Sequence, residues 1–349
     1  MSTQCNYLYG VAAANGSTSF GPIGIDGRDV WVVSEGSIAM VIGPVSHSDF
    51  SQLPPQKVLQ YLAEHQRVLE HVMTRSTVIP VKFGTVVNDE QRVAGILNAG
   101  REEFTIALDR HADKAEFDLA VSWVDLPAVL AEIANDESVV SMKTQIASKA
   151  EPSMQQRIAL GQLVKQLLDK KSQNIASRLV VALRAKWPDV IVNPTRDDSV
   201  LLNAAVLINR GQERQFDQML EELNKSYQNR LNFRSVGPLP PYSFATAEVK
   251  TTSVADLDAA RRTLELGDSA SLVDIKAAHR RCLKEHHPDK NPASDAADRV
   301  KEISAAYELL EEYASHFKHT FSEPADTVAA IVRIRSVADL REHPAAQAA

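Results

Sequence analysis

Four basic side chains gather on one face of a predicted helix near the C-terminal end of the chain. The run Leu272–Lys284 is amphipathic, and the face opposite its apolar residues carries Lys276, Arg280, Arg281 and Lys284. Three of the four follow one another at i, i+4 intervals, a spacing at which like charges lower helix stability. We interpret this face as a surface that recognises an acidic partner, so its chemistry is binding.

A tight loop follows this helix and joins it to a second one. The loop Glu285–Asn291 contains His287, Pro288 and Asp289 in succession. By itself this tripeptide is typical of an ordinary turn that ends a helix, because proline cannot continue a helix and aspartate favours turns. Its meaning therefore depends on the elements that flank it.

Both flanking helices carry apolar stripes that can bury each other. Ser271 and Asp274 have the spacing of a cap that begins the first helix. Its stripe consists of Leu272, Ile275, His279, Cys282 and Leu283, and that of the second helix of Val300, Ile303, Ala306, Tyr307 and Leu310. Two such stripes on consecutive helices joined by a short loop predict an antiparallel helical hairpin.

Taken together, the hairpin, its loop and its basic face resemble a J-domain, the module that stimulates the ATPase of DnaK-type chaperones. The resemblance implies that the loop and the basic face dock on the chaperone, with His287, Pro288 and Asp289 as the stimulating residues. The chain departs from the family pattern in two places. His279 stands where an aromatic residue is common, and the usual acidic-then-basic end of the third helix is missing after Leu310.

Length and composition describe an ordinary globular protein of two or three domains. The chain has 349 residues and a net charge of −7, which argues against a general nucleic-acid binder. Cys5 and Cys282 lie far apart with no CxxC pair, a pattern that favours a reducing compartment and excludes a thiolate-rich zinc site. We expect Cys282 to be a small buried hydrophobe. Without a signal peptide or a membrane-length apolar run, the sequence predicts a cytoplasmic protein with no membrane partner.

No arrangement typical of a catalytic or cofactor site stands out. Ser/His/Asp and Cys/His arrangements of nucleophilic catalysis are not recognisable. His65 and His71 lie six residues apart, which is not the spacing of a helical metal pair, so His65 is expected on the surface or in the core. The glycine-rich run Gly21–Gly27 is neither a Walker A loop nor a dinucleotide fingerprint. We expect no enzyme activity, no cofactor and no bound metal.

The N-terminal third mixes strands and helices. We predict a strand at Tyr7–Val11, a β-hairpin from Val30–Val33 and Ser37–Ile42 that Gly43-Pro44 ends, a helix at Pro55–Thr74, a strand at Thr77–Val87 interrupted by Pro80, and one helix from Asp89 to about Asp109. This order is typical of an α+β layer of sheet and helices.

The middle third predicts a second α+β domain. After a strand at Glu116–Val124, we expect helices at Leu126–Ile133 and Pro152–Trp187, the latter with breaks at Gly161 and Lys170–Asn174. Strands at Val190–Val192, Ser199–Ile208 and Arg230–Val236 then enclose a helix at Gly211–Gln228. This order is close to a ferredoxin-like βαββαβ domain.

Residues 5–250 resemble the gas vesicle accessory proteins of the GvpF/GvpL family. The resemblance rests on Tyr7–Gly10, the helical His65–Glu70, Val78–Thr85 with its Pro-Val-Lys-Phe-Gly-Thr core, and the segment Gly237–Phe244. It implies a role in assembling gas vesicles, the hollow protein shells that make some microbes buoyant, and it transfers no catalytic residues. The segment Gly237–Tyr242 is also a possible proline-rich ligand, but a rigid loop between two strands is the preferred interpretation.

The chain ends in a hinge, the helical module and a tail. Thr246–Ser253 is predicted as a last strand, followed by a helix capped at Ser253 that runs to about Leu266. Residues 325–335 are expected to form a short strand or helix. The sequence Ser253–Leu257 recurs as Ser336–Leu340, which we interpret as a shared strand-to-helix cap.

The predicted fold class is α+β, with two sheet-and-helix domains, the second ferredoxin-like, followed by a small all-α J-domain hairpin. The predicted domains are residues 1–115, 116–250 and 251–320, with a tail at 321–349. The resemblances imply an assembly protein in the cytoplasm and on gas vesicles that couples shell components and accessory proteins to a DnaK-type chaperone. The alternatives are a minor structural component of the vesicle and a general J-domain co-chaperone.

Overall fold

The computed structural model divides the chain into two compact units. It describes residues 5–14, 16, 18–46, 49–50, 53–148, 153–195, 197–252, 254–286, 296–316, 329–337 and 339. One unit combines Met1–Arg110 with Thr246–Arg335, and the other combines His111–Ala245 with Ser336–Ala349. This division follows compactness, so the predicted domain boundaries after residues 115, 250 and 320 stay predictions.

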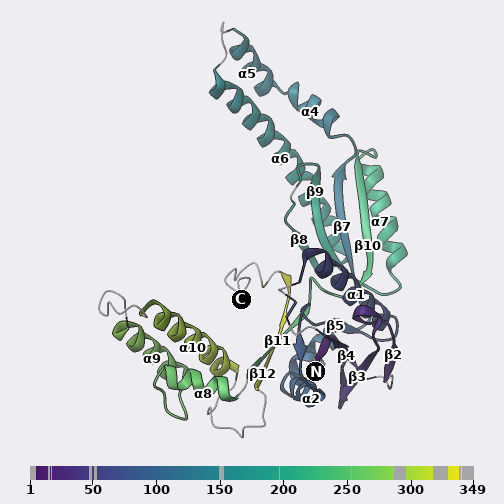
Figure 1. The fold of residues 1–349 in the computed structure, drawn as a ribbon. Coiled ribbons are helices and arrows are strands. Elements are labelled where there is room, and N and C mark those ends of the chain that lie inside the picture. Colours follow the sequence, from purple (N-terminus) through teal and green to yellow (C-terminus); the bar gives the residue numbers. More distant parts are fainter. Residues whose placement is uncertain are drawn as a thin grey trace. The chain divides into compact units, whose positions relative to one another are not determined.

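The first unit is built on an antiparallel sheet with strand order β2-β3-β4-β1-β5, and β6 also pairs with β1 (Figure 1). Its strands are β1 (Cys5–Ala13), β2 (Ser19–Gly21), β3 (Val30–Glu35), β4 (Ile38–Val45), β5 (Val78–Pro80) and β6 (Val86–Val87). The predicted hairpin is confirmed, because β3 and β4 pair up to Glu35 and Ile38. Gly36 adopts a φ of 64° in the turn between them, a conformation that glycine adopts without steric cost.

Three helices and one short 3-10 turn complete this part of the first unit. They are η1 (Ile25–Gly27), α1 (Pro55–Met73), α2 (Glu90–Ala99) and α3 (Arg101–Arg110). The prediction of one helix from Asp89 to Asp109 is wrong in one respect, because Gly100 separates α2 from α3. A Cβ atom at Gly100 would lie 2.7 Å from a Val332 methyl carbon, so the break lets a distant strand approach the helices closely.

The second unit contains a four-stranded antiparallel sheet with order β10-β7-β9-β8. Its strands are β7 (Lys114–Trp123), β8 (Val190–Asn193), β9 (Val200–Asn209) and β10 (Leu231–Leu239), and its helices are α4 (Leu126–Ala134), α5 (Glu137–Ala147), α6 (Met154–Lys186) and α7 (Glu213–Ser226). Numbered within the unit, the strands lie in the order 4-1-3-2. This βαββαβ arrangement is consistent with the ferredoxin-like prediction.

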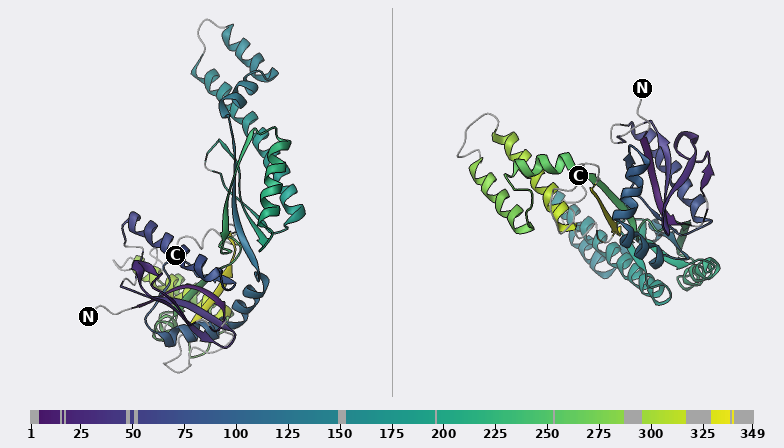
Figure 2. Two further views of the ribbon diagram at one scale, coloured as in Figure 1. Left: turned by 90° about the vertical axis from the view of Figure 1, so that its right-hand side faces the viewer. Right: turned by 90° about the horizontal axis from the view of Figure 1, so that it is seen from below.

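The helix α6 is continuous over 33 residues, so the predicted breaks at Gly161 and Lys170–Asn174 are wrong. A capping box between Ser153 and Gln156 begins it. Gly161 is exposed and lowers helix stability by only about 1 kcal/mol, which is too little to interrupt a long helix that packs elsewhere. Together with α4 and α5, α6 extends well beyond the sheet of its own unit (Figures 1 and 2).

Two strands that are far apart in the sequence form a separate antiparallel ribbon. The strand β11 (Thr246–Thr252) pairs over its whole length with β12 (Ala329–Arg335). The helices α8 (Val254–Thr263), α9 (Leu272–Glu285) and α10 (Ala296–His316) lie between these strands in the chain (Figure 1). The helical module is therefore inserted between paired strands, and the expected short strand or helix at 325–335 is a strand.

Candidate functional site

The three helices α8, α9 and α10 share one apolar core. Of the predicted stripes, Ile275 and Cys282 of α9 and Ile303, Ala306 and Leu310 of α10 are buried. The helix α8 contributes Leu257, Ala260 and Leu264 to the same core. Cys282 is a buried residue, as predicted, and burial raises the pKa of its thiol. This core fixes the orientation of the polar side chains on α9.

The start of α9 is held by the predicted cap. The Ser271 hydroxyl accepts a hydrogen bond from the Asp274 N–H at 3.2 Å, and Asp274 accepts one from the Ser271 N–H at 2.9 Å. The Ser271 side chain and backbone donors together lower the pKa of the Asp274 carboxyl below its usual range. The end of α9 leads into the predicted loop, and His287, Pro288 and Asp289 lie outside the described residues.

The four predicted basic residues of α9 are all exposed. Two of them form ion pairs with acidic residues of the module, and among the described residues the other two do not. Lys276 forms an ion pair with Glu311 of α10 at 3.1 Å, and Arg281 forms one with Glu265 at 3.3 Å. Within the described part of the chain, Arg280 and Lys284 form no ion pair. These two residues stand one helical turn apart and are the most available cations of the predicted surface.

His279, one of the two departures from the J-domain pattern, stacks on Tyr307. Their ring centroids lie 4.0 Å apart with an interplanar angle of 8°. A side-chain hydrogen bond to Glu311 raises the pKa of Tyr307 to about 12, and burial lowers the pKa of His279. A neutral imidazole can therefore fill an aromatic position between α9 and α10.

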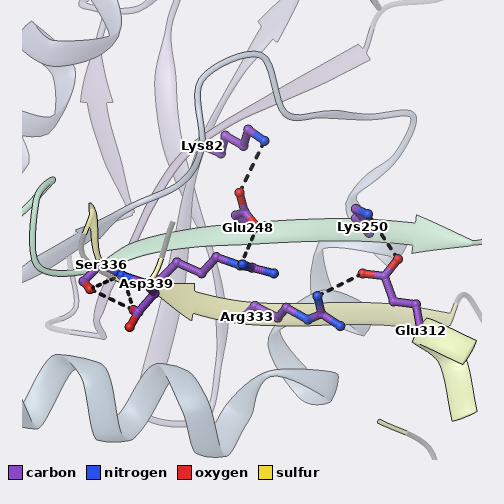
Figure 3. A network of polar contacts seen from close by, with 8 residues as sticks. Lys82, Glu248, Lys250, Glu312, Arg333, Ser336 and Asp339 are labelled. Carbon is purple, nitrogen blue, oxygen red and sulfur yellow. Dashed lines mark hydrogen bonds and ion pairs between the residues drawn. The ribbon is translucent and has the colours of Figure 1, made fainter. Parts of the chain in front are cut away.

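A network of charges connects α10 to the ribbon (Figure 3). Glu312 of α10 accepts a hydrogen bond from Lys250 of β11 at 3.1 Å and pairs with Arg333 of β12 at 3.4 Å. On the same ribbon, Glu248 pairs with Arg335 at 2.9 Å and with Lys82 at 3.3 Å. Sequence reasoning missed this network. The available signal was the alternation of charged and apolar residues in β11 and in β12. No local pattern reveals that these two segments pair with each other.

The space between the helical module and the ribbon is an open cleft of about 440 Å³. Its lining combines Lys250 and Arg333 of the ribbon, Leu272 and Lys276 of α9, and Glu308, Glu311 and Glu312 of α10. Lys276 therefore faces a cleft, whereas Arg280 and Lys284 do not line it.

The predicted segment Val78–Thr85 is anchored by buried aromatic residues of the first unit. The Tyr7 hydroxyl accepts a hydrogen bond from the Gly84 N–H at 3.1 Å and lies 2.9 Å from Nδ1 of His65. Phe83 packs edge-on against both of these rings. His65 is thus a core residue, and burial lowers its pKa to about 4.

The predicted segment Gly237–Phe244 begins as the end of strand β10 at Gly237–Leu239 and continues as a loop that leads to β11, and the loop contacts a buried acid. Pro238 is exposed, but Pro240 and Pro241 are buried, which argues against an exposed proline-rich ligand. Ser243 donates from its N–H and its hydroxyl to the two carboxylate oxygens of Glu116, at 2.8 and 2.7 Å. Glu116 is 2% exposed, and this burial raises its pKa to about 7 despite the two hydrogen bonds.

Two absences apply to the described residues only. No helix in the described ranges is long and apolar enough to cross a membrane. Nor do the described side chains include a group of three or more His, Cys, Asp or Glu that could hold a metal ion.

Known proteins match the chain in two separate parts. The family described as gas vesicle synthesis protein GvpL/GvpF matches residues 5–246, and the DnaJ domain matches residues 262–316. Gas vesicle protein F of Streptomyces sp. (strain CB03234) is 24% identical over 68% of this chain and 98% of its own. The chaperone protein DnaJ of Exiguobacterium sp. is 53% identical over 14% of this chain and 13% of its own, so that likeness is limited to the module.

Solved structures confirm the fold of the larger part. The crystal structure of gas vesicle protein GvpF from Anabaena sp. PCC7120 covers 69% of this chain and 97% of its own with a TM-score of 0.58 at 23% identity. GvpF from Microcystis aeruginosa gives a TM-score of 0.56 at 22% identity. With a family match over more than half of its length, the chain belongs to the GvpL/GvpF family of gas vesicle synthesis proteins and carries a DnaJ domain between its paired strands β11 and β12.

Proposed function

We propose that this protein is an adaptor that brings gas vesicle shell components to a DnaK-type chaperone. The observation that carries the proposal is that one chain contains both a part that matches the GvpL/GvpF family, residues 5–246, and a DnaJ domain. We call the GvpL/GvpF part the body. The body would bind shell components or other accessory proteins of the vesicle, and the module would recruit the chaperone. The role needs no catalytic group in the chain itself, and we propose that the protein is not an enzyme.

The need for such an adaptor follows from the physical chemistry of a gas-filled shell. A shell protein must be apolar on the side that faces gas, so before assembly it exposes apolar surface of the kind that aggregates. Delivery to a chaperone at the site of assembly would suppress this aggregation. The exposed Arg280 and Lys284 support the chaperone half of the proposal, because they present positive charge on the helix that precedes His287-Pro288-Asp289 in the sequence.

The test is the ATPase rate of a purified DnaK-type chaperone with and without the full chain. We expect the wild-type chain to accelerate ATP hydrolysis and His287→Gln to abolish the acceleration. His286→Gln is the matched control, because it makes the same chemical change one residue earlier and is expected to keep the acceleration. No acceleration by the wild-type chain would refute the adaptor mechanism.

The vesicle half of the proposal needs a separate measurement. Vesicles are floated from cells that produce the chain, washed, and probed for it together with the chaperone. An assembly adaptor is expected to leave the vesicles during washing. Stable retention after washing would instead favour the alternative role of a minor structural component.

A further inference from the structure

The β11–β12 ribbon has one apolar face and one face that carries its charged residues together with Ile331. On one face, Ala247 and Val332 are buried, and Val332 lies against the α2–α3 junction at Gly100. On the other face the register places Glu248 opposite Arg333, with Arg335 two residues further along β12. Because side chains alternate along a strand, Lys250 joins this charged face. The ribbon therefore attaches to the body by its apolar face and by the Glu248–Lys82 ion pair, which leaves Lys250 and Arg333 of its charged face for another partner.

That partner within the chain is α10. Glu312 pairs with Lys250 on one strand and with Arg333 on the other, so one carboxylate joins the helix to both strands of the ribbon (Figure 3). The Glu312 side chain is only 17% exposed, so these pairs are less screened than ordinary surface pairs. The contact is made by charge and has the geometry to hold the module in one orientation.

This contact affects one end of the predicted chaperone surface. Leu272 and Lys276, in the first turns of α9, line the cleft between the module and the ribbon. The neighbouring Glu311 also holds Lys276 in an ion pair. Arg280 and Lys284, further along α9, are outside the cleft. The ribbon thus partly covers the beginning of the basic face and leaves its end open.

We propose that Glu312, Lys250 and Arg333 form a charge clasp that keeps the Lys276 end of the chaperone-facing surface partly closed. The Lys276 side chain is 50% exposed in the cleft, and opening of the clasp removes the ribbon from its other side, so that a partner can reach it together with Arg280 and Lys284. The clasp is a contact within this chain and needs no partner protein. Its effect on chaperone binding rests on the function proposed above. The two parts are therefore tested by different measurements.

The clasp is tested by a distance measurement in the full chain without chaperone. Spin labels are placed at Val273→Cys on α9 and Ile106→Cys on α3, positions that are 76% and 59% exposed, while the native Cys5 and Cys282 are buried. We expect one narrow distance distribution, which Glu312→Gln broadens. Raising the salt to about 1 M, where the screening length is about 3 Å, should have the same effect.

Glu308→Gln is the matched control for Glu312→Gln. Glu308 lines the same cleft one helical turn earlier and forms no ion pair within the described part of the chain. Its substitution should leave the distribution narrow. A broad distribution in the wild-type chain, or one that Glu312→Gln leaves unchanged, would overturn the clasp.

The closure of the surface is tested by combining two substitutions in the ATPase assay. In the wild-type background, Lys276→Ala should change the concentration of chain needed for half-maximal acceleration by less than about twofold. Glu312→Gln should lower that concentration several-fold, and Lys276→Ala in this background should then raise it several-fold. Equal effects of Lys276→Ala in both backgrounds would overturn the closure. A wild-type chain that fails to accelerate hydrolysis refutes the adaptor function, and the distance measurement still decides the clasp.

Discussion

At the scale of residues, the segments Val78–Thr85 and Gly237–Phe244 supply hydrogen-bond partners to buried polar groups of the body. Ser243 is the partner of the buried Glu116, from which it is separated by 127 residues. Gly84 brings its N–H to the Tyr7 hydroxyl, which in turn lies against His65. These polar groups would each lower stability if they were left buried without a partner. The segments are thus explained by folding before any binding role is assigned to them.

The pKa of Glu116 predicts how stability depends on pH. Because burial raises this pKa from 4.5 to about 7, the folded state binds a proton between pH 4.5 and 7 that the unfolded state has lost. The contribution of Glu116 to the free energy of unfolding is therefore fully present below about pH 4.5 and is lost as the pH rises to about 7. The expected loss is about 3 kcal/mol.

Glu116→Gln should remove most of this decrease, measured as the free energy of unfolding in denaturant at several pH values. Asp118, whose pKa is also raised by burial, accounts for a remaining slope. The exposed Glu221→Gln is the control and should keep the wild-type pH dependence. If Glu116→Gln and the wild-type chain lose stability in parallel, Glu116 is not the titrating group.

Residue patterns predicted local features well and long-range partners poorly. The cap at Ser271, the buried Cys282 and the exposed basic residues of α9 follow from spacing on a single helix, and all are confirmed. The partners of Glu312 do not follow from spacing. Lys250 is 62 residues away, and its position beside Arg333 depends on the register of β11 with β12.

At the scale of elements, the wrong predictions share one cause, which is that packing decided between alternatives of similar local energy. The predicted helix from Asp89 to Asp109 is divided at Gly100, where β12 approaches. The residues Gly43-Pro44 were predicted to end a strand, yet β4 continues through them to Val45. At Gly43 the absence of a side chain leaves room for the Tyr9 ring, because a Cβ there would lie 3.2 Å from it.

The close approach at Gly100 makes a prediction about stability. A Cβ atom there would lie 2.7 Å from Val332 and 2.8 Å from Phe104, so Gly100→Ala should lower the free energy of unfolding by about 1–3 kcal/mol. Gly95→Ala is the matched control in the neighbouring helix α2, where an added Cβ meets nothing within 4 Å. It should raise stability by about 0.5–1 kcal/mol, as expected for glycine inside a helix. Thermal unfolding of the two variants measures both effects, and equal shifts would contradict the packing at Gly100.

At the scale of the whole molecule, the helical module is an insertion and not an appendix. Thr252 and Ala329, the ends of the strands that flank it, are partners in the ribbon register. A short turn can therefore join these strands directly, as in any β-hairpin. The sequence could not predict this, because the apolar run of β12 is short and stands alone, and its partner strand lies before the module.

Two shortened chains test this arrangement. Replacing residues 253–328 by a two-residue Asn-Gly turn should keep the body folded, because β11 and β12 still pair. Ending the chain at Thr252 should destabilise the first unit by several kcal/mol, since it removes the buried Ala330, Ile331 and Val332. Chemical denaturation of both chains gives the comparison. A truncated chain as stable as the internally shortened one would show that β12 does not belong to the body.

The place of β12 at the far side of the module also sets an order during protein synthesis. A ribosome completes α8, α9 and α10 before it makes the strand that packs against Gly100 and pairs with β11. The GvpL/GvpF body therefore cannot reach its final form until the DnaJ domain has already been translated. A nascent chain interrupted after α10 and before residue 329 carries the complete module on an unfinished body, whereas in the natural chain a finished body is always preceded by a translated module.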